Sequence, residues 1–173
     1  MDERSSQDSA ATHLDVAMLR ELGIVYAFAL DSNEPSVLHD VFTEDAVWRH
    51  GADDVRVGRE VICRIPARLA AAYASTAHQI TSQHVRLRTD GTALVHSLCV
   101  ASHLTAQSSA SGTIYEVMLR YRDECRRTAE GWRIVSRDLQ TLWSRDYEVE
   151  TAGGRRMPKT AGEHPTGSKE KHV

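Results

Sequence analysis

Apolar side chains recur at three- and four-residue intervals between residues 13 and 30, which is the spacing of one face of an α-helix. The pattern predicts a helix over 13–30 that packs this face against the rest of the protein. The next segment, DSNEP, ends the helix: Ser32 and Asn33 can cap a new helix and Pro35 suits its first turn, so a second short helix is expected over about 35–42. The apolar positions of the first helix are Leu14, Ala17, Met18, Leu22, Val25, Tyr26 and Ala29.

The hydrophobic period changes in the second half of the chain. A strand centred on Val47 and a short helix interrupted by Pro66 come first, and from His78 onward apolar and polar residues alternate with period two. Alternating segments flank the Thr-Asp-Gly sequence at 89–91 and the Glu-Gly sequence at 130–131, which are signals for β-hairpins. Helices followed by long antiparallel strands predict an α+β fold, in which the helices cover one face of a curved antiparallel sheet.

Charge is nearly balanced, with 21 Lys and Arg against 24 Asp and Glu, so the net charge is −3 with neutral His. A protein that binds a run of nucleic-acid phosphates, or a polybasic membrane surface, would carry an excess of positive charge. No segment approaches the roughly 18 to 20 uninterrupted apolar residues of a membrane span, and the first residues are acidic and polar, unlike a signal peptide. These features predict a cytoplasmic protein without nucleic-acid or membrane partners.

One domain with polar ends is expected. Residues 12–146 form the domain, residues 1–11 are expected to be a flexible N-terminus, and residues 147–173 a disordered tail that contains all three lysines and few large apolar side chains. The three cysteines show no CxxC or short Cys/His spacing, so buried free thiols are expected rather than a disulfide framework or a structural zinc site. The cysteines are Cys63, Cys99 and Cys125.

Three phrases of the sequence carry a resemblance to a known family. They are YAFALDSNEPSVLHDVFTEDAVW at 26–48, HQI at 78–80, which opens the long strands, and GWRIVSR at 131–137, which closes them. In this order the chain resembles the nuclear transport factor two-like superfamily and its SnoaL-like branch, which includes scytalone dehydratase, bile-acid dehydratase and hexachlorocyclohexane dehydrochlorinase. The resemblance spans residues 12–146 and implies a cone-shaped, strongly curved sheet wrapped around the N-terminal helices, with a pocket at the open end. Because this fold carries many functions, the resemblance indicates the fold more specifically than the reaction.

The resemblance also implies a set of site residues. In the lyase members, a Tyr or Lys, an Asp five residues later and a His further along meet in the pocket, and the matching positions here are Tyr26, Asp31 and His78. Arg137 matches an arginine of the last strands, and His103 lies where some dehydratases place a second histidine. A bulge in either strand would turn the His103 side chain away from the site.

If the family resemblance is set aside, the roles of Asp31 and His78 have two interpretations. Asp31 closes an apolar helix at the negative end of its macrodipole, so a nearby imidazolium would compensate the carboxylate. The contact would fix one imidazole tautomer and make His78 a general base. Alternatively, Asp31 caps the DSNEP turn and His78 begins a strand at the surface. Tyr26 lies about 140° around the helix from Asp31, so it is either a hydrogen-bond donor in the site or part of the core.

A metal site would have to use His84, His96 and His103. His84 shares the strand parity of His78, but His96 and His103 are expected on opposite faces of their strand, and no carboxylate has ligand-like spacing. No metal is therefore expected. The aromatic residues expected in the core or the pocket wall are Trp48, Trp132, Trp143, Phe28 and Phe42.

The leading functional hypothesis is a cofactor-free acid/base lyase or isomerase. His78 would remove a proton next to a carbonyl or allylic system, with Asp31 orienting the imidazole. Tyr26 would be the acid or hydrogen-bond donor, Arg137 would stabilise oxyanion charge, and loss of water or a double-bond shift would follow. The expected substrate is a small, mostly apolar cyclic molecule such as a polyketide, steroid or terpenoid. Two alternatives stay open: a non-catalytic scaffold like the β subunit of ring-hydroxylating dioxygenases, and a small-molecule binding protein or cyclase.

A homo-oligomer, dimer or trimer, is also expected. Helices can cover only one face of the sheet, and the opposite strand parity is expected to place apolar side chains on the other face, which then needs a partner. The side chains expected there are Val95, Cys99, Ala101, Val135 and Leu139.

Overall fold

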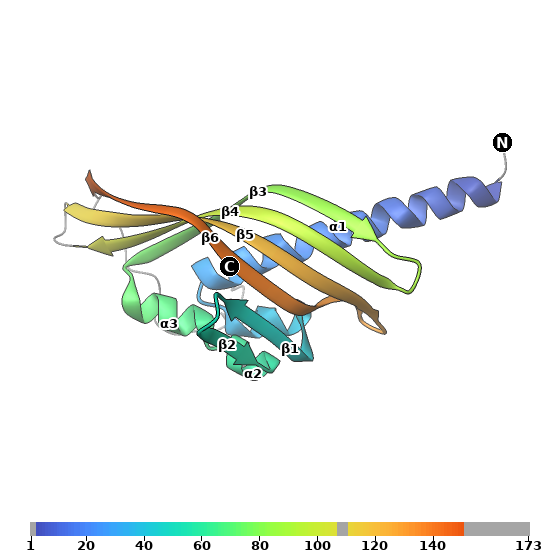
Figure 1. Ribbon diagram of the computed structural model, residues 1–173, viewed down its shortest axis with the longest axis horizontal. Helices are drawn as coiled ribbons and strands as arrows, with labels where there is room; N and C mark the ends of the chain where they lie inside the picture. The colour runs from blue at the N-terminus through green and yellow to red at the C-terminus, as the bar shows by residue number, and fades with distance from the viewer. Residues whose placement is uncertain (1–2, 107–110, 151–173) are drawn as a thin grey trace, which may run out of the picture.

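The computed structural model describes residues 3–106 and 111–150, and its elements follow the predicted order of helices first and long strands later (Figure 1). A long helix, α1, runs along a curved six-stranded sheet, and its N-terminal end projects past the sheet (Figure 1). The predicted α+β class is confirmed. The helical elements are α1 (Glu3–Asp31), the 3-10 helix η1 (Pro35–Asp40), α2 (Arg59–Ile62) and α3 (Ile65–Ala72). The strands are β1 (Phe42–His50), β2 (Asp54–Val57), β3 (Ser75–Leu87), β4 (Thr92–Ala106), β5 (Ser111–Thr128) and β6 (Gly131–Glu150).

The first helix and the last strand extend beyond residues 12–146. Helix α1 begins at Glu3 rather than at residue 13, so the segment 1–11 that we expected to be flexible is helical from Glu3 onward. The polar start of α1 offers no apolar stripe to detect, whereas extending a formed helix adds one hydrogen bond per residue. Strand β6 continues to Glu150, past the predicted boundary at residue 146, and the rest of the predicted tail, 151–173, lies outside the described residues.

The buried face of α1 differs from the predicted stripe. Leu14 and Met18 are 62% and 37% exposed, although the stripe includes them. Leu19 and Leu30, which the stripe omits, are buried instead. Because α1 carries apolar residues on two sides, their spacing cannot tell which side faces the sheet. The members of the predicted stripe that are buried are Leu22, Tyr26 and Ala29.

The short helices also differ in detail from the sequence pattern. The helix expected over 35–42 is η1, but Asn33 takes a left-handed conformation (φ 54°) at the end of α1 and does not cap η1. Pro66 lies in the first turn of α3, where its missing N–H is not needed. The predicted single helix interrupted by Pro66 is therefore two helices, α2 and α3, with the break before the proline.

The six strands are ordered β2-β1-β6-β5-β4-β3, and all neighbours are antiparallel except β1 and β6, which run parallel. The antiparallel run from β3 to β6 confirms the prediction. Gly91 (φ 77°) and Gly131 (φ 111°) take left-handed conformations at the two predicted hairpin turns. The parallel pairing of β1 with β6 joins strands that no short turn connects, so no local pattern predicts it.

A bulge in β3 decides which of its side chains face α1. The pairing of β3 with β4 shifts register within residues 80–82. His78 lies opposite the buried Ala101, whereas His84 lies opposite the exposed His96. Ala101 and His96 are five residues apart and therefore face opposite sides of β4. The prediction that His84 shares the face of His78 is wrong, because the bulge reverses the alternation.

Residues expected on the outer face of the sheet lie in its core. Val95, Cys99, Ala101 and Leu139 are buried in one cluster with the sheet-facing side of α1. The placement was wrong because strand alternation separates the two faces of a strand without saying which face meets the helix. Val135 is half-buried.

The aromatic residues and cysteines follow the predictions in part. Phe28 and Trp143 are 52% and 45% exposed, so their expected place in the core or pocket wall is wrong. All three cysteines are free, and two are buried. Among the described helices, none is long and apolar enough to cross a membrane. The aromatic residues buried as expected are Trp48, Trp132 and Phe42.

A buried ion pair lies at the centre of the core. Arg137 is fully buried, and its Nε and Nη2 atoms each donate a hydrogen bond of 2.7 Å to the carboxylate of Asp123. The central carbon of the guanidinium lies 4.2, 4.7 and 5.8 Å from the ring centroids of Tyr26, Tyr121 and Phe42. Burial alone lowers the pKa of the guanidinium, but the Asp123 carboxylate raises it above its ordinary value, so Arg137 stays charged.

Neutralising Asp123 is expected to destabilise the fold strongly. Asp123→Asn leaves the buried guanidinium of Arg137 without its counter-charge, which should lower the free energy of unfolding by about 3–5 kcal/mol in urea titrations. The matched control is Glu124→Gln, because Glu124 pairs with Arg122 at 2.8 Å where both side chains are 44% exposed. This control should change stability by no more than about 0.5 kcal/mol. Equal effects of the two substitutions would contradict the role of the pair.

Candidate active site

Asp31 is the last residue of α1, where the helix dipole is negative and a carboxylate is disfavoured. The helix ends there without help from the Asp31 side chain: the backbone N–H of Ser32 donates to the Phe28 carbonyl at 2.9 Å, and Asn33 turns the chain. The carboxylate is therefore free to bond outside the helix, and strand β3 supplies its donors.

Three hydrogen bonds join Asp31 to β3. His78 donates twice, from its backbone N–H to Oδ2 and from Nδ1 to Oδ1, each at 2.7 Å. The Thr76 hydroxyl donates to Oδ1 at 2.8 Å. Ala101 lies opposite His78 on β4, and its small side chain leaves room for the imidazole. The predicted contact between Asp31 and His78 is confirmed.

The Asp31 carboxylate sets the tautomer of His78. Burial raises the pKa of the carboxyl, but the hydrogen bonds and charge of His78, with the bond from Thr76, bring that pKa below its ordinary value of 3.8. An ionised carboxylate only accepts hydrogen bonds, so Nδ1 of His78 carries a proton and Nε2 of the neutral ring has the unshared electron pair. The His78 side chain is 5% exposed and that of Asp31 27%, so the pair opens to solvent on the carboxylate side.

His103 lies beside His78, at the position that the resemblance implies. The two rings meet edge to face with their centroids 5.5 Å apart. Nδ1 of His103 donates to the backbone carbonyl of Tyr115 at 3.3 Å, which leaves its Nε2 as an acceptor. Burial, and then the charge of His78, lower the pKa of the His103 imidazole. His103 therefore stays neutral at neutral pH, including when His78 takes up a proton.

Two tyrosines and a threonine that sequence analysis did not assign complete the surroundings. The rings of Tyr73 and Tyr115 lie 4.7 and 5.9 Å from the His103 ring, centroid to centroid. Strand alternation could have found Tyr115, which lies opposite His103 on β5. Tyr73 follows α3 in an irregular connection, where no periodic pattern exists. Thr76 lies two residues before His78 on β3, and its role depends on the position of Asp31.

Tyr26 and Arg137 lie in the core, away from the carboxylate–imidazole pair. The Tyr26 hydroxyl accepts a hydrogen bond from Nε1 of Trp48 at 3.0 Å, and burial raises its pKa. Cys99 is buried in the same core cluster as Tyr26, and burial raises the pKa of its thiol. The structure therefore divides the predicted residues into a core group and a group around the imidazole.

One donor of the core group is unpaired. Nη1 of Arg137 is buried and has no hydrogen-bond partner among the described residues. An unpaired buried donor is costly, and the rings of Tyr26, Tyr121 and Phe42 that face the guanidinium offset part of this cost.

The histidines do not converge on a metal-binding geometry. Within residues 3–106 and 111–150, no group of three or more His, Cys, Asp or Glu side chains is placed to hold a metal ion. His84 and His96 lie directly opposite each other on the exposed face, whereas His103 is buried on the inner face.

Comparison with known proteins identifies a family. The sequence profile described as the SnoaL-like domain matches residues 11–138, most of the described chain. No protein among curated ones matches at a significant level.

Solved structures agree with the fold. An NTF2-like protein with a cystatin-like fold from Novosphingobium aromaticivorans is 22% identical, with a TM-score of 0.71 over 82% of this chain and 90% of that one. A candidate scytalone dehydratase from the same species is 20% identical, with a TM-score of 0.69 over 82% and 93%. A hexachlorocyclohexane dehydrochlorinase from Novosphingobium barchaimii is 13% identical, with a TM-score of 0.64 over 88% and 99%. At these identities the likeness shows the fold alone.

Removing the Asp31 charge is expected to weaken the pH dependence of stability in acid. Because the folded-state pKa of Asp31 lies below 3.8, its ionised form stabilises the fold above that pH, and this contribution is lost as the pH falls through the folded-state pKa. Urea unfolding of Asp31→Asn, measured from neutral pH to below 3.8, should therefore vary less with pH than that of the wild type. Asp53→Asn, at an exposed carboxylate, is the control and should match the wild type. Identical pH dependence of the two variants would contradict the expectation.

Proposed function

This chain belongs to the SnoaL-like domain family, and we propose that it is a cofactor-free acid/base lyase or isomerase whose base is His78. The observation that carries the proposal is the 2.7 Å hydrogen bond between Nδ1 of His78 and Oδ1 of Asp31, which leaves Nε2 available as a base. A capping role does not account for this bond, because Asn33 and backbone hydrogen bonds already end α1.

In the proposed reaction, Nε2 of His78 takes a proton from a carbon next to a carbonyl or an allylic system. The electron pair of the broken C–H bond moves into an enolate or dienolate. In a dehydratase this pair then expels a neighbouring hydroxyl group, which takes up a proton and leaves as water. In an isomerase a proton returns at another carbon instead. Asp31 stabilises the imidazolium that forms in either case.

His103 is suited to bind a substrate hydroxyl. Its lowered pKa keeps the ring neutral, so it does not compete with His78 for the abstracted proton. Its Nε2 can accept a hydrogen bond from a substrate O–H group. The rings of Tyr73 and Tyr115 flank His103 and favour a flat, mostly apolar cyclic substrate.

Arg137 and Tyr26 act from the core side in this proposal. Arg137 is fully buried and bound to Asp123, so in this proposal it holds α1 against β6 behind the imidazole rather than touching the substrate. The Tyr26 hydroxyl is buried beside Arg137 and accepts its bond from Trp48, so Tyr26 supports the site through the packing of α1.

Hydrogen–deuterium exchange tests the proposal even while the product is unidentified. Cyclic ketones with a hydroxyl group or a double bond are incubated with the protein in D₂O, and NMR follows exchange at the carbon next to the carbonyl. On a ketone that exchanges, His78→Ala and Asp31→Asn should each lower the rate by on the order of 10² to 10⁴. Tyr26→Phe should have a smaller effect, because the base remains intact.

His84→Ala is the matched control, since His84 is an exposed histidine of the same strand on the opposite face. It should exchange at the wild-type rate. Circular dichroism and melting temperature verify that each variant is folded. Folded His78→Ala protein with wild-type exchange would make the pair structural, and the function would then be that of a scaffold subunit or a binding protein.

A further inference from the structure

Helix α1 has a second apolar face that the rest of the described chain leaves uncovered. Leu14, Ile24 and Phe28 are 62%, 50% and 52% exposed, and Met18 is 37% exposed. At 100° per residue these positions fall within an arc of about 120°. A helix face that meets water normally carries polar side chains, but within residues 14–28 Glu21 is the charged residue of this arc. We name this face the outer stripe, formed by Leu14, Ala17, Met18, Ile24, Val25 and Phe28, of which Val25 is half-buried against the core.

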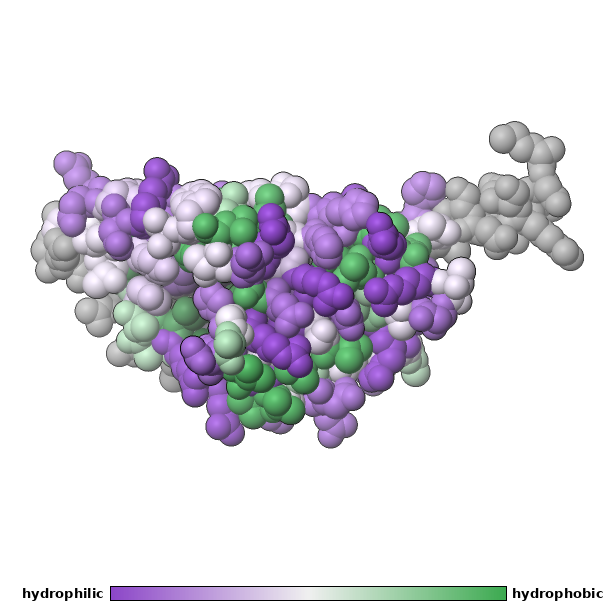
Figure 2. Space-filling view, viewed as in Figure 1, coloured by the Kyte–Doolittle hydropathy of each residue, from purple (hydrophilic) through white to green (hydrophobic). Residues whose placement is uncertain are grey.

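The outer face of the sheet is polar by comparison. Arg122 pairs with Glu124 at 2.8 Å and with Asp138 at 3.6 Å. Figure 2, in which β5 and β6 face the viewer, shows hydrophilic side chains across the middle of this surface. The exposed large apolar side chains of β6 are Leu142 and Trp143. The outer stripe is therefore the more continuous apolar surface.

The outer stripe is symmetric about Glu21. Its apolar positions lie three, four and seven residues from Glu21 on both sides. Two antiparallel helices related by a twofold axis at Glu21 would therefore place an apolar residue against an apolar residue at each level except the centre, where the two Glu21 side chains meet. The facing pairs would be Leu14 with the partner's Phe28, Ala17 with the partner's Val25, and Met18 with the partner's Ile24.

We propose that α1 pairs with α1 of a second copy of this chain through the outer stripe, antiparallel and centred on Glu21. Charge near the axis supports a second copy as the occupant. Arg20 is exposed next to Glu21, and the twofold axis brings it within one residue, about 1.5 Å along the helix, of the level of the partner's Glu21, so two reciprocal ion pairs offset the approach of the two carboxylates.

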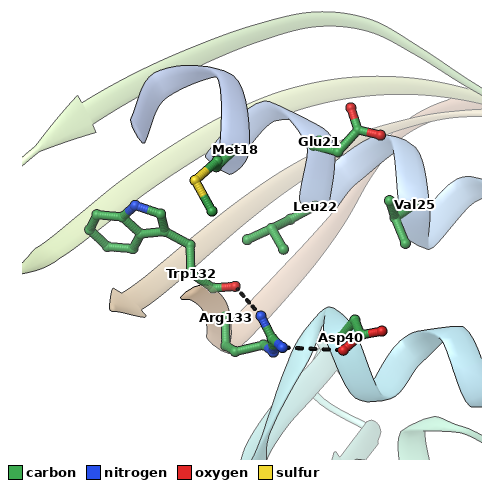
Figure 3. A pocket seen from close by; sticks show the side chains of 7 residues that line it. All are labelled: Met18, Glu21, Leu22, Val25, Asp40, Trp132 and Arg133. Atoms are coloured by element: carbon green, nitrogen blue, oxygen red, sulfur yellow. Dashed lines mark hydrogen bonds and ion pairs between the residues drawn. The ribbon is translucent and has the colours of Figure 1, made fainter. Parts of the chain in front are cut away.

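A groove beside the stripe gives the partner helix a place to seat a side chain. It has a volume of about 190 Å³ and lies between α1, η1 and the start of β6 (Figure 3). Figure 3 shows Arg133 closing its far side through hydrogen bonds to Asp40 and to the carbonyl of Trp132, at 3.2 and 3.0 Å. Because Met18 forms one wall, the proposed pairing places the partner's Ile24 at this groove. Its apolar lining comes from Met18, Leu22, Val25 and Trp132.

Sedimentation velocity of the full chain at micromolar concentrations tests the pairing, and it does not depend on the proposed activity. The wild type should sediment as a dimer. Ile24→Glu and Phe28→Glu should each raise the dissociation constant by about ten-fold or more, because they bury a charge in the contact. Val57→Glu is the matched control: Val57 is 64% exposed on β2, away from α1, and this variant should remain dimeric. Melting temperatures should stay near that of the wild type.

Trp143→Glu distinguishes this contact from one through the sheet. A monomeric wild type would overturn the proposal. So would dissociation by Trp143→Glu together with an intact dimer in Ile24→Glu, since Trp143 lies on the outer sheet face.

Oxidative cross-linking tests the register. Glu21→Cys lies at the twofold axis and should form a disulfide-linked dimer on mild oxidation, seen on a non-reducing gel. Leu14→Cys, on the same stripe, would lie about 21 Å from its counterpart and should not cross-link. The wild-type chain, oxidised in the same way, shows how much cross-linking comes from the native cysteines. Cross-linking by both variants would indicate parallel helices and overturn the antiparallel arrangement, and cross-linking by neither would overturn the pairing.

Discussion

The charge of Arg137 is the constraint around which the core is arranged. A guanidinium without water needs a carboxylate and electron-rich surroundings, and these come from three different elements: Asp123 and Tyr121 from β5, Tyr26 from α1 and Phe42 from β1. The strand β6 that carries Arg137 therefore fixes the helix and both of its sheet neighbours at once. Such a pair is costly to bury and more costly to break, so it favours this one arrangement over other ways of packing the same apolar residues.

The candidate site also depends on the compensation of a charge, here the Asp31 carboxylate at the C-terminal end of α1. A carboxylate at the negative end of this helix is unfavourable by itself, and the fold compensates it with three donors from β3. One of these donors is the backbone of His78, so the position of the strand and the orientation of its imidazole are set together. The pair is therefore rigid enough to define a proton acceptor, while the neighbouring His103 is kept neutral by its own burial.

Helix α1 carries more apolar surface than one sheet can cover. Its inner side packs through Leu19, Leu22 and Tyr26, and its outer side presents a separate stripe of similar length. Folding and association can thus use different faces of one element, so a change on the outer stripe need not disturb the core. This arrangement also places Asp31 on the helix that contacts a second copy in our proposal.

The sequence by itself determined the succession of helices and strands and the hairpin glycines, because these depend on local period and backbone conformation. By resemblance it also predicted that Tyr26, Asp31 and His78 meet with His103 near them, and of these the structure brings together Asp31, His78 and His103. The tertiary structure alone decided which face of α1 is buried, where the bulge in β3 reverses the alternation, and that Tyr26 and Arg137 belong to the core. It also brought Tyr73 and Thr76 to the site. The physical reason is that a periodic pattern reports how often side chains return to one face, whereas burial depends on what distant segments place against that face.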